Sequence, residues 1–596
     1  MAPEDCRNLV HMLLMQADKR GERPFLFQRR DGSRTHLSWA ETVARITRLS
    51  EALIREGVGP GDRVALISEN RPEWLIADFA IMAAGAITVP AYTTSTTRDY
   101  LHILDNSRAK GAIVSTARLG RTVLPAAHEA DSLEFVLMME DPAIRQSINA
   151  RIIDLDRAMS ESPCDIPSMR ERVAALGRDD LACLIYTSGT GGAPKGVMLH
   201  HGAILHNCSG AIDVLKSIGL ENNSFLSFLP LSHAYEHTAG QALPVSIGAE
   251  IHYAEGLDKL ASNMAEVRPT IMVVVPRLFE MLRNRVLRQV EKEGGLKLRL
   301  FERALALGIE RYRRGGRLPL RDRLSDAVLD WLVRAKVRKR FGGRLKALVS
   351  GGAPLNREVG EFFVGLGLPL LQGYGQTESA PLISVNRPGK AKTHTVGPPV
   401  KGVDVRIAED GEILVRGELV MKGYWEDARA TAETIRDGWL HTGDIGLIDE
   451  DGHLVITDRK KDLIVTDKGE NVSPQRVEGM LAFEPEIAQV MVHGDDRPYL
   501  VAVIVPDPEW LAGWARENGK PCDLAALRED RAFRAALDDA VSRVNRRLSI
   551  IEKVRRFIVA REPFSVDNEQ MTPTMKIRRH VISRLYGDEI AALYRA

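Results

Sequence analysis

The segment of this 596-residue chain best suited to chemistry is Tyr186–Gly196, which reads YTSGTGGAPKG and follows the apolar run at 181–188. Glycines let backbone N–H groups turn toward an anion, hydroxyls donate to phosphate oxygens, and the Lys195 ammonium neutralises charge. It is not a Walker loop, because Pro194 precedes the lysine and Val197 follows the second glycine. A glycine-rich surface turn is the alternative, but the density of phosphate-binding residue types favours a phosphate loop.

A second polar segment, GYGQTE at 373–378, combines an aromatic ring with a carboxylate. Tyr374 lies between two glycines and can place its ring on a purine face, although a core tyrosine is the alternative. Glu378 follows Thr377, and a hard oxygen ligand at a strand end suits Mg²⁺ that bridges ATP phosphates. A lone glutamate at a solvated helix start would look the same without these neighbours.

The histidines at 200, 201, 233 and 237 do not form a predicted zinc site, because no cysteine or carboxylate completes a ligand set at the usual spacing. The cysteines also lack CxxC spacing, which suits a reducing compartment and argues against a disulfide framework. No signal peptide is predicted at the charged N-terminus, and the default location is the cytoplasm.

The elements that must position these residues form an α/β protein. The short apolar runs that end in Gly, Ser or Pro predict parallel sheets covered on both faces: 63–68, 85–92, 112–115, 181–188, 270–276 and 347–352. Ligands of such sheets bind at the carboxyl ends of strands. The apolar run Trp74–Tyr92 predicts a buried helix followed by a strand, not a membrane span.

From about residue 400, alternating residues around Asp-Gly turns predict antiparallel hairpins. We therefore predict a large N-terminal domain at 1–458, with a β-rich subdomain at about 395–458 and a basic helical insertion at about 281–346. A small α+β domain at 459–596 follows, and it includes a predicted hairpin within 487–507.

Taken in order, the polar segments resemble the motifs of the acyl-adenylate-forming superfamily, which includes acyl-CoA synthetases, peptide-synthetase adenylation domains and luciferases. The loop Tyr186–Gly196 is similar to its signature loop, although the family usually has Thr at Gly191, a change that would loosen the grip on pyrophosphate. The other similar segments are LPLSHAYEH (229–237), VPRLFE (275–280), SGGAPL (350–355), GYGQTE (373–378), TGD (442–444), DRKKD (458–462), GENVSP (469–474) with Glu478, and PTMKIRR (573–579).

The resemblance implies a nucleotide site made of Thr187, Ser188, Gly189, Thr190, Lys195, Gly351, Gly352, Ala353, Gly373, Tyr374, Gly375, Gln376, Thr377, Asp444 and Arg459. It implies catalytic roles for Lys576, His233 and Glu378, with Thr187 and Glu378 on Mg²⁺. It also makes Lys461 the hinge of a mobile lid and places Gly469, Glu470 and Asn471 beside the CoA channel. Without the resemblance, Asp444 would be read as a turn residue and Lys576 as part of a solvated basic tail.

The implied reaction is fatty acid activation with ATP and coenzyme A as co-substrates. Attack of the carboxylate on the α-phosphate makes an acyl-AMP and expels pyrophosphate, and the CoA thiol then displaces AMP. Lys576 is expected to bridge the carboxylate and the α-phosphate, and His233 to orient the acyl carboxylate. Charge neutralisation and positioning carry the first step. Alternatives that share these motifs are a fatty acyl-AMP ligase for a carrier protein, a luciferase-like oxygenase and an inactive lipid-binding relative.

Charge is distributed unevenly along the chain. The segment 281–346 holds 20 Lys/Arg and 7 Asp/Glu, a net of +13, whereas the whole chain is +1 and the remainder is therefore −12. The overall balance implies no nucleic-acid partner. The segment resembles an insertion of long-chain fatty acyl-CoA synthetases, and its basic helices predict peripheral contact with an anionic membrane. A solvated arm or a homodimer contact explains such a run of charge equally well.

Overall fold

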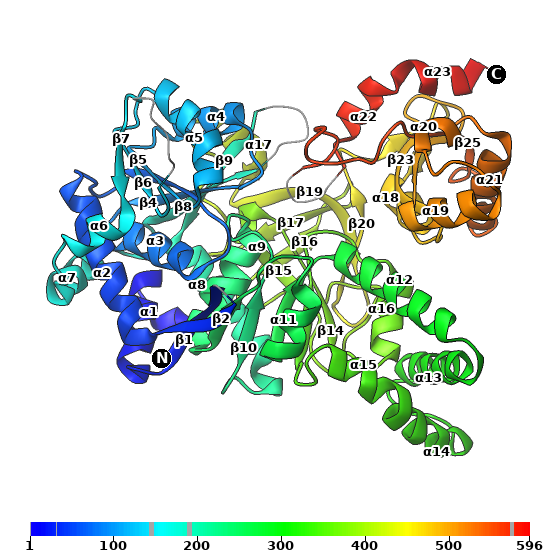
Figure 1. Cartoon of the computed structure of the whole chain (residues 1–596), viewed down its shortest axis with the longest axis horizontal. Helices are drawn as coiled ribbons and strands as arrows, with labels where there is room; N and C mark the ends of the chain where they lie inside the picture. Colours follow the sequence, from blue (N-terminus) through cyan, green and yellow to red (C-terminus); the bar gives the residue numbers. More distant parts are fainter. Residues whose placement is uncertain (1, 31, 142–147, 188–192, 573–576, 596) are drawn as a thin grey trace.

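The structure is a computed structural model that describes residues 2–30, 32–141, 148–187, 193–572 and 577–595. Figure 1 shows the N-terminal sheets and helices at the left and centre, with the C-terminal part at the upper right. None of the helices in the described ranges combines the length and apolar character that a membrane span requires.

One sheet of the described chain has seven strands in the order β7-β6-β5-β3-β4-β8-β9, all parallel except β9. Their bounds are β3 (Arg63–Ile67), β4 (Ile87–Ala91), β5 (Gly111–Val114), β6 (Phe135–Met138), β7 (Arg151–Asp154), β8 (Leu181–Thr187) and β9 (Lys195–His200). Alternate residues of β3 enter different cores: Val64 and Leu66 pack with Trp74, whereas Ala65 and Ile67 pack with Leu104. Both faces are therefore covered, as predicted.

A second sheet has eight strands in the order β15-β14-β13-β12-β10-β11-β1-β2, parallel except for β15 and β2 at its edges. Their bounds are β1 (Pro24–Arg30), β2 (Ser33–Ser38), β10 (Ser224–Ser227), β11 (Glu250–Tyr253), β12 (Ile271–Val274), β13 (Ala347–Ser350), β14 (Leu370–Gly375) and β15 (Leu382–Val385). Here too neighbouring residues Ile271 and Met272 belong to different cores.

Helices fill the connections between these strands. Local signals set their starts: Pro72 occupies the first turn of α3, and Ser38 with Glu41 forms a capping box at α2. The helices before the insertion are α1 (Leu9–Arg20), α2 (Trp39–Arg55), α3 (Pro72–Ala83), α4 (Thr97–Ser107), α5 (Ala117–Glu129), α6 (Leu155–Ser160), α7 (Ile166–Ala175), α8 (His201–Leu215), α9 (Ala234–Glu236), η3 (His237–Ala242), α10 (Leu243–Ile247) and α11 (Leu260–Val267). The predicted buried helix and strand within Trp74–Tyr92 are confirmed as α3 and β4.

The basic segment connects the neighbouring strands β12 and β13. It is helical, as predicted: α12 (Pro276–Glu293), α13 (Gly295–Arg313), α14 (Leu320–Leu329), the π-helical turn η4 (Asp330–Arg334) and α15 (Ala335–Arg340). Phe301 and Phe341 of this segment are buried in a hydrophobic core to which α16 (Arg357–Gly365) also contributes.

After residue 400 the predicted hairpins are confirmed. Strands β16 (Asp404–Ile407), β17 (Glu412–Arg416), β18 (Ile435–Arg436), β19 (Trp439–Ile448) and β20 (Leu454–Arg459) form an antiparallel sheet. The short helices beside it are η5 (Thr377–Ser379) and α17 (Ala428–Thr434).

The C-terminal part has its own hydrophobic cores, in which Val490 and Phe533 are buried. Strands β23 (Ile487–His493) and β24 (Leu500–Pro506) form the predicted hairpin, and β25 (Val554–Val559) runs parallel to β24. The other elements are β21 (Ile464–Val465), β22 (Asn471–Val472), α18 (Pro474–Leu481), α19 (Pro508–Glu517), α20 (Leu524–Leu527), α21 (Arg531–Asn545), α22 (Arg579–Leu585) and α23 (Gly587–Arg595).

Candidate active site

Four of the predicted motifs lie at one edge of the second sheet. The strands β10, β12, β13 and β14 are parallel neighbours, and their carboxyl ends lead into 229–237, 275–280, 350–355 and 373–378 respectively. Segments far apart in the chain are therefore brought to one place by strand order. This is the edge at which α/β sheets bind ligands.

A cavity of about 1550 Å³ opens at this edge. The predicted site residues that line it are Thr187, Lys195, His233, Gly351, Gly352, Ala353, Gly373, Tyr374, Gly375, Gln376, Thr377, Glu378, Asp444, Arg459 and Lys461. Ser188, Gly189, Thr190 and Lys576, as well as Gly191, lie outside the described residues. Gly469, Glu470 and Asn471 are exposed and do not line the cavity.

Tyr374, Asp444 and Arg459 form one connected group on the cavity wall. The Tyr374 hydroxyl donates to Asp444 Oδ2 at 2.7 Å, and Arg459 Nε donates to Asp444 Oδ1 at 3.1 Å. Burial, followed by the charge of Asp444, raises the pKa of Tyr374, so that the phenol stays protonated and donates. The carboxylate therefore has fixed partners and retains lone pairs that can accept hydrogen bonds from a diol.

The residues predicted to hold phosphate and metal line the same cavity. Thr187 and Lys195 are directly opposite each other in the β8–β9 ladder, at the base of the predicted phosphate loop. The Lys195 ammonium pairs with Asp427 Oδ2 at 3.4 Å, and Lys195 lines the cavity. Glu378 Oε1 accepts from the Tyr424 hydroxyl at 2.8 Å. The Glu378 carboxylate and the Thr187 hydroxyl are hard oxygen donors on one cavity, and this donor set fits Mg²⁺.

The histidine motif is fixed against the glycine motif that follows β13. His233 caps α9, and its Nδ1 accepts from the Tyr235 N–H at 3.1 Å. The Tyr235 hydroxyl donates to the carbonyl of Val349, near the carboxyl end of β13, at 2.8 Å. A Cβ on Gly351 would lie 2.9 Å from the Tyr235 ring, so this position needs glycine.

Part of the cavity lining is apolar. This part comes from α8, the sheet and α10: Cys208, Ala211, Val214, Leu215, Phe225, Leu243, Ile271 and Val273. The C-terminal part also lines the cavity, through residues that include Gln475, Glu478, Met571, Thr572, Ile577 and Arg578. One cavity is thus lined by the tyrosine–aspartate group, by an apolar set of side chains and by residues after 474. The apolar set is called the apolar recess.

A model of the AMP-binding enzyme family matches residues 13–425, and a model of the AMP-binding enzyme C-terminal domain matches residues 461–596. The chain belongs to the AMP-binding enzyme family.

Curated relatives of this AMP-binding enzyme match it over almost its whole length. It is 37% identical over 572 residues to the long-chain-fatty-acid–CoA ligase FadD15 of Mycobacterium tuberculosis, covering 95% of this chain and 93% of that protein. It is 32% identical to the peroxisomal long chain acyl-CoA synthetase 6 of Arabidopsis thaliana, covering 94% of this chain and 81% of that one.

Solved structures agree on the fold. The adenylation domain of a carboxylate reductase from Mycobacterium chelonae superposes with a TM-score of 0.77 at 22% identity, covering 99% of this chain and 91% of that one. The anthranilate CoA ligase AuaEII, in complex with anthranoyl-AMP, superposes with a TM-score of 0.73 at 21% identity, covering 98% and 99%.

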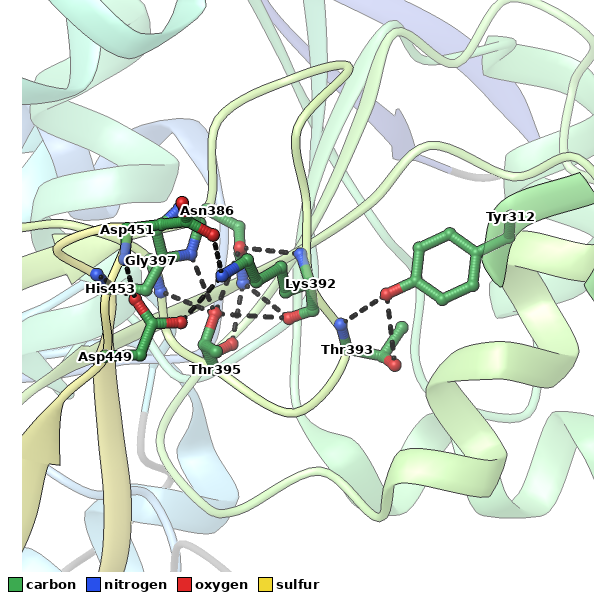
Figure 2. Close-up of polar contacts among 9 residues, drawn as sticks. All are labelled: Tyr312, Asn386, Lys392, Thr393, Thr395, Gly397, Asp449, Asp451 and His453. Carbon is green, nitrogen blue, oxygen red and sulfur yellow. Dashed lines mark hydrogen bonds and ion pairs between the residues drawn. The ribbon is translucent and has the colours of Figure 1, made fainter. Parts of the chain in front are cut away.

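Sequence analysis missed a loop that closes one side of the cavity of this AMP-binding enzyme. The residues Thr393, His394, Thr395 and Val396 line it, and Figure 2 shows how the loop is clamped. On one side Lys392 Nζ pairs with Asp449 at 2.7 Å and Asp451 at 2.6 Å. On the other side the Tyr312 hydroxyl of α13 accepts from the Thr393 N–H at 2.7 Å. The contact between Tyr312 and Thr393 spans 81 residues, so no local signal could have found it.

A buried polar group behind the cavity wall was also missed. Asp78 Oδ2 accepts from Gln241 Nε2 at 2.7 Å and lies 2.9 Å from His237 Nε2, all three being buried. These contacts fix η3, a π-helical turn whose Thr238 lines the cavity. The neighbouring Glu236 is fully buried, and burial raises the pKa of its carboxyl to about 8.

Proposed function

We propose that this protein is an ATP-dependent long-chain fatty acid–CoA ligase that forms acyl-CoA through an acyl-AMP intermediate and releases AMP and pyrophosphate. The observation that carries the proposal is the single cavity that joins the Tyr374–Asp444 group to the apolar recess along α8. Relatives that bear the ligase name over nearly the full chain support the same reaction.

The nucleotide is proposed to lie along the edge of β13 and β14. Gly351, Gly352 and Ala353 border the adenine, and the Tyr374 ring stacks on it. Asp444 accepts hydrogen bonds from the ribose hydroxyls, and Arg459 holds that carboxylate in place. Gly373, Gly375, Gln376 and Thr377 supply the surrounding wall.

In the first half-reaction a carboxylate oxygen bonds to the α-phosphorus while the bond from that phosphorus to pyrophosphate breaks. His233 orients the carboxylate, and Lys195 with the loop Thr187–Thr190 holds the departing phosphates. Lys576 is the proposed bridge between carboxylate and α-phosphate. The flanking residues Thr572 and Ile577 line the cavity, which supports this assignment. These groups act by neutralising charge as it collects at phosphorus.

Magnesium is proposed as the metal, held by Glu378 and Thr187, whose oxygen donors fit it. When bound, it would neutralise phosphate charge. The Tyr424 hydroxyl that donates to Glu378 fixes the orientation of the carboxylate before metal and ATP arrive.

In the second half-reaction the sulfur of CoA bonds to the acyl carbon, the bond from that carbon to AMP breaks, and the thiol proton leaves to solvent. We propose that residues 459–596 form a lid that turns about Lys461, separate from the large domain at 1–458. Gly469, Glu470 and Asn471 would then border the CoA channel. These three residues are exposed and do not line the cavity in the present arrangement of the C-terminal part. This supports a role for them after the lid has turned, in the second half-reaction.

The test is pyrophosphate release across C2 to C24 acids, with and without CoA. We expect turnover with long-chain acids and accumulation of acyl-CoA when CoA is present. Accumulation of acyl-AMP regardless of CoA would instead favour delivery to a carrier protein. Light or oxygen consumption would favour an oxygenase.

For location and partners we propose a cytoplasmic enzyme that meets anionic membranes peripherally through 281–346. The described cysteines are all unpaired, which supports a reducing compartment. The local excess of 13 positive charges supports the membrane contact. The prediction of a basic surface from the charges of 281–346 is wrong for Arg334, which is fully buried and pairs with Asp326 and Asp330.

A further inference from the structure

The outward face of α14 and η4 is a stripe of large apolar side chains. Leu320 is 80% exposed, Leu324 77%, Val328 47% and Trp331 74%. The first three recur every fourth residue and Trp331 follows by three, so all four lie on one side of the helix. Figure 1 shows α14 at the lower right edge of the molecule, away from the two large sheets. These four residues form what we call the apolar stripe.

The opposite side of the same helix faces the protein and is partly ionic. Leu329 is buried there beside Leu307, and the guanidinium of Arg334 is fully buried against Asp326. Asp326 also pairs with Arg311 of α13 at 3.1 Å. Folding therefore turns charges inward, where they pair, and leaves leucines and a tryptophan outward. Core packing does not explain the apolar stripe, because its members add little to the interior.

Arginines border the apolar stripe. Arg317, Arg321 and Arg323 are exposed, and the Arg321 side chain is 86% exposed. On the helix, Arg321 and Arg323 project to either side of the line from Leu320 to Leu324. An apolar strip with a rim of arginines matches the two layers of an anionic bilayer surface, in which phosphates lie above acyl chains.

We propose that the apolar stripe of α14 and η4 enters the acyl layer of an anionic membrane while Arg317, Arg321 and Arg323 pair with lipid phosphates. The inference refines the membrane contact in the proposed function and rests on it. The two contacts differ in their response to salt. A membrane contact made by charge alone would be lost at high salt, whereas one that buries apolar side chains in the acyl layer persists. Such a contact would hold the enzyme at the layer where fatty acids partition.

The experiment compares Leu320→Ser/Leu324→Ser with the matched control Leu257→Ser/Ile550→Ser. The control leucine and isoleucine are 64% and 75% exposed and lie in turns elsewhere in the chain. Flotation with phosphatidylglycerol–phosphatidylcholine and with pure phosphatidylcholine vesicles is measured at low and high salt, without ATP, CoA or fatty acid. We expect the stripe variant to lose binding by about tenfold or more at both salt concentrations, and the control to bind like the wild type.

Two further measurements complete the test. The tryptophan fluorescence emission of the wild type should shift to the blue when vesicles are added. The Trp331→Phe variant should lose part of that shift while still binding vesicles. Turnover of a soluble medium-chain acid should be equal in all variants, which checks that they fold.

Equal vesicle binding by stripe variant and wild type would overturn the proposal. So would a lipid-free dimer that becomes monomeric in the stripe variant, because a second copy would then cover the face. A wild type that binds vesicles but ligates no acid would contradict the proposed function and leave this inference standing.

Discussion

Asp444 and Arg459 lie directly opposite each other in the β19–β20 ladder, with Arg459 Nε 3.1 Å from Asp444 Oδ1. The second oxygen of the same carboxylate accepts from the Tyr374 hydroxyl. One side chain thus joins the aromatic wall of the cavity to the last strand before the C-terminal part. The Asp444 carboxylate therefore fixes the positions of both Tyr374 and Arg459 at the proposed ribose site.

Asp444→Asn should raise the KM for ATP by about tenfold or more, since a charge-assisted acceptor is worth roughly 1.5–3 kcal/mol. Pyrophosphate exchange at varied ATP concentration measures it. Asp404→Asn is the control, because Asp404 pairs with Arg416 on the exposed edge of the same sheet. An unchanged KM would show that Asp444 does not contact the nucleotide.

Glu378→Gln should shift the magnesium titration of pyrophosphate release to higher concentration by on the order of tenfold, because an amide contributes no charge to the ion. Tyr424→Phe is an informative companion. It removes the hydroxyl that orients Glu378 and should cause a smaller shift in the same direction. Identical titrations for wild type and Glu378→Gln would exclude this carboxylate as a metal ligand.

Lys576→Ala should abolish formation of acyl-AMP while sparing thioester formation from supplied acyl-AMP, because its charge is needed only while negative charge collects at phosphorus. The two half-reactions are assayed separately. Lys520→Ala, which removes a surface partner of Asp530, should affect neither. Equal loss of both half-reactions would refute the assignment.

Arg288→Glu should slow the first half-reaction more than the second. Arg288 of α12 pairs with Asp507 at 3.0 Å and with Glu509, and these contacts tie the insertion to the C-terminal part in its present orientation. We expect an effect of several-fold, from about 1 kcal/mol. The reciprocal variant Arg288→Asp/Asp507→Arg should recover the rate. Lys297→Glu, on an exposed turn of α13, is the control.

No preference between half-reactions in Arg288→Glu, or no recovery in the reciprocal variant, would contradict a positioning role for this ion pair.

Glu236→Gln should make stability less dependent on pH. Burial raises the pKa of Glu236 from its ordinary 4.5 to about 8 in the folded state. The unfolded chain therefore loses this proton first, and the wild type should lose roughly 1 kcal/mol per pH unit from this group between about pH 5 and 8. Urea unfolding of both proteins at pH 5.5 and 7.5 measures the difference. Parallel losses in the two proteins would show that Glu236 does not titrate in this range.

Local patterns were sufficient for the strands and for the edge at which the motifs meet. Apolar runs such as 63–68 and 347–352 end in small residues, and parallel strands place their carboxyl ends together. Contacts between residues far apart in the chain could not be predicted from local patterns. Tyr312 contacts Thr393, 81 residues away, and Asp78 contacts His237, 159 residues away.

The burial of Arg334 shows a different limit. Asp330 is four residues away, as in a regular helix, but the second partner, Asp326, is eight residues away with the π-helical turn η4 between, and that pair was not predicted. The spacing of Leu320, Leu324 and Val328 was visible in the sequence. The surrounding run of arginines and lysines favoured a basic surface over an apolar one.

The connection between β12 and β13 touches the C-terminal part through Arg288, the cavity loop through Tyr312 and the outside through the apolar stripe. One continuous chain segment therefore contacts both the wall of the proposed nucleotide site and the C-terminal part, and it also carries the proposed lipid-binding stripe. Thermodynamic reciprocity then sets a condition on any communication between them. If lipid at α14 favours the arrangement that binds ATP, bound ATP must strengthen attachment to lipid by the same factor, and reaction products that favour the other arrangement must weaken it.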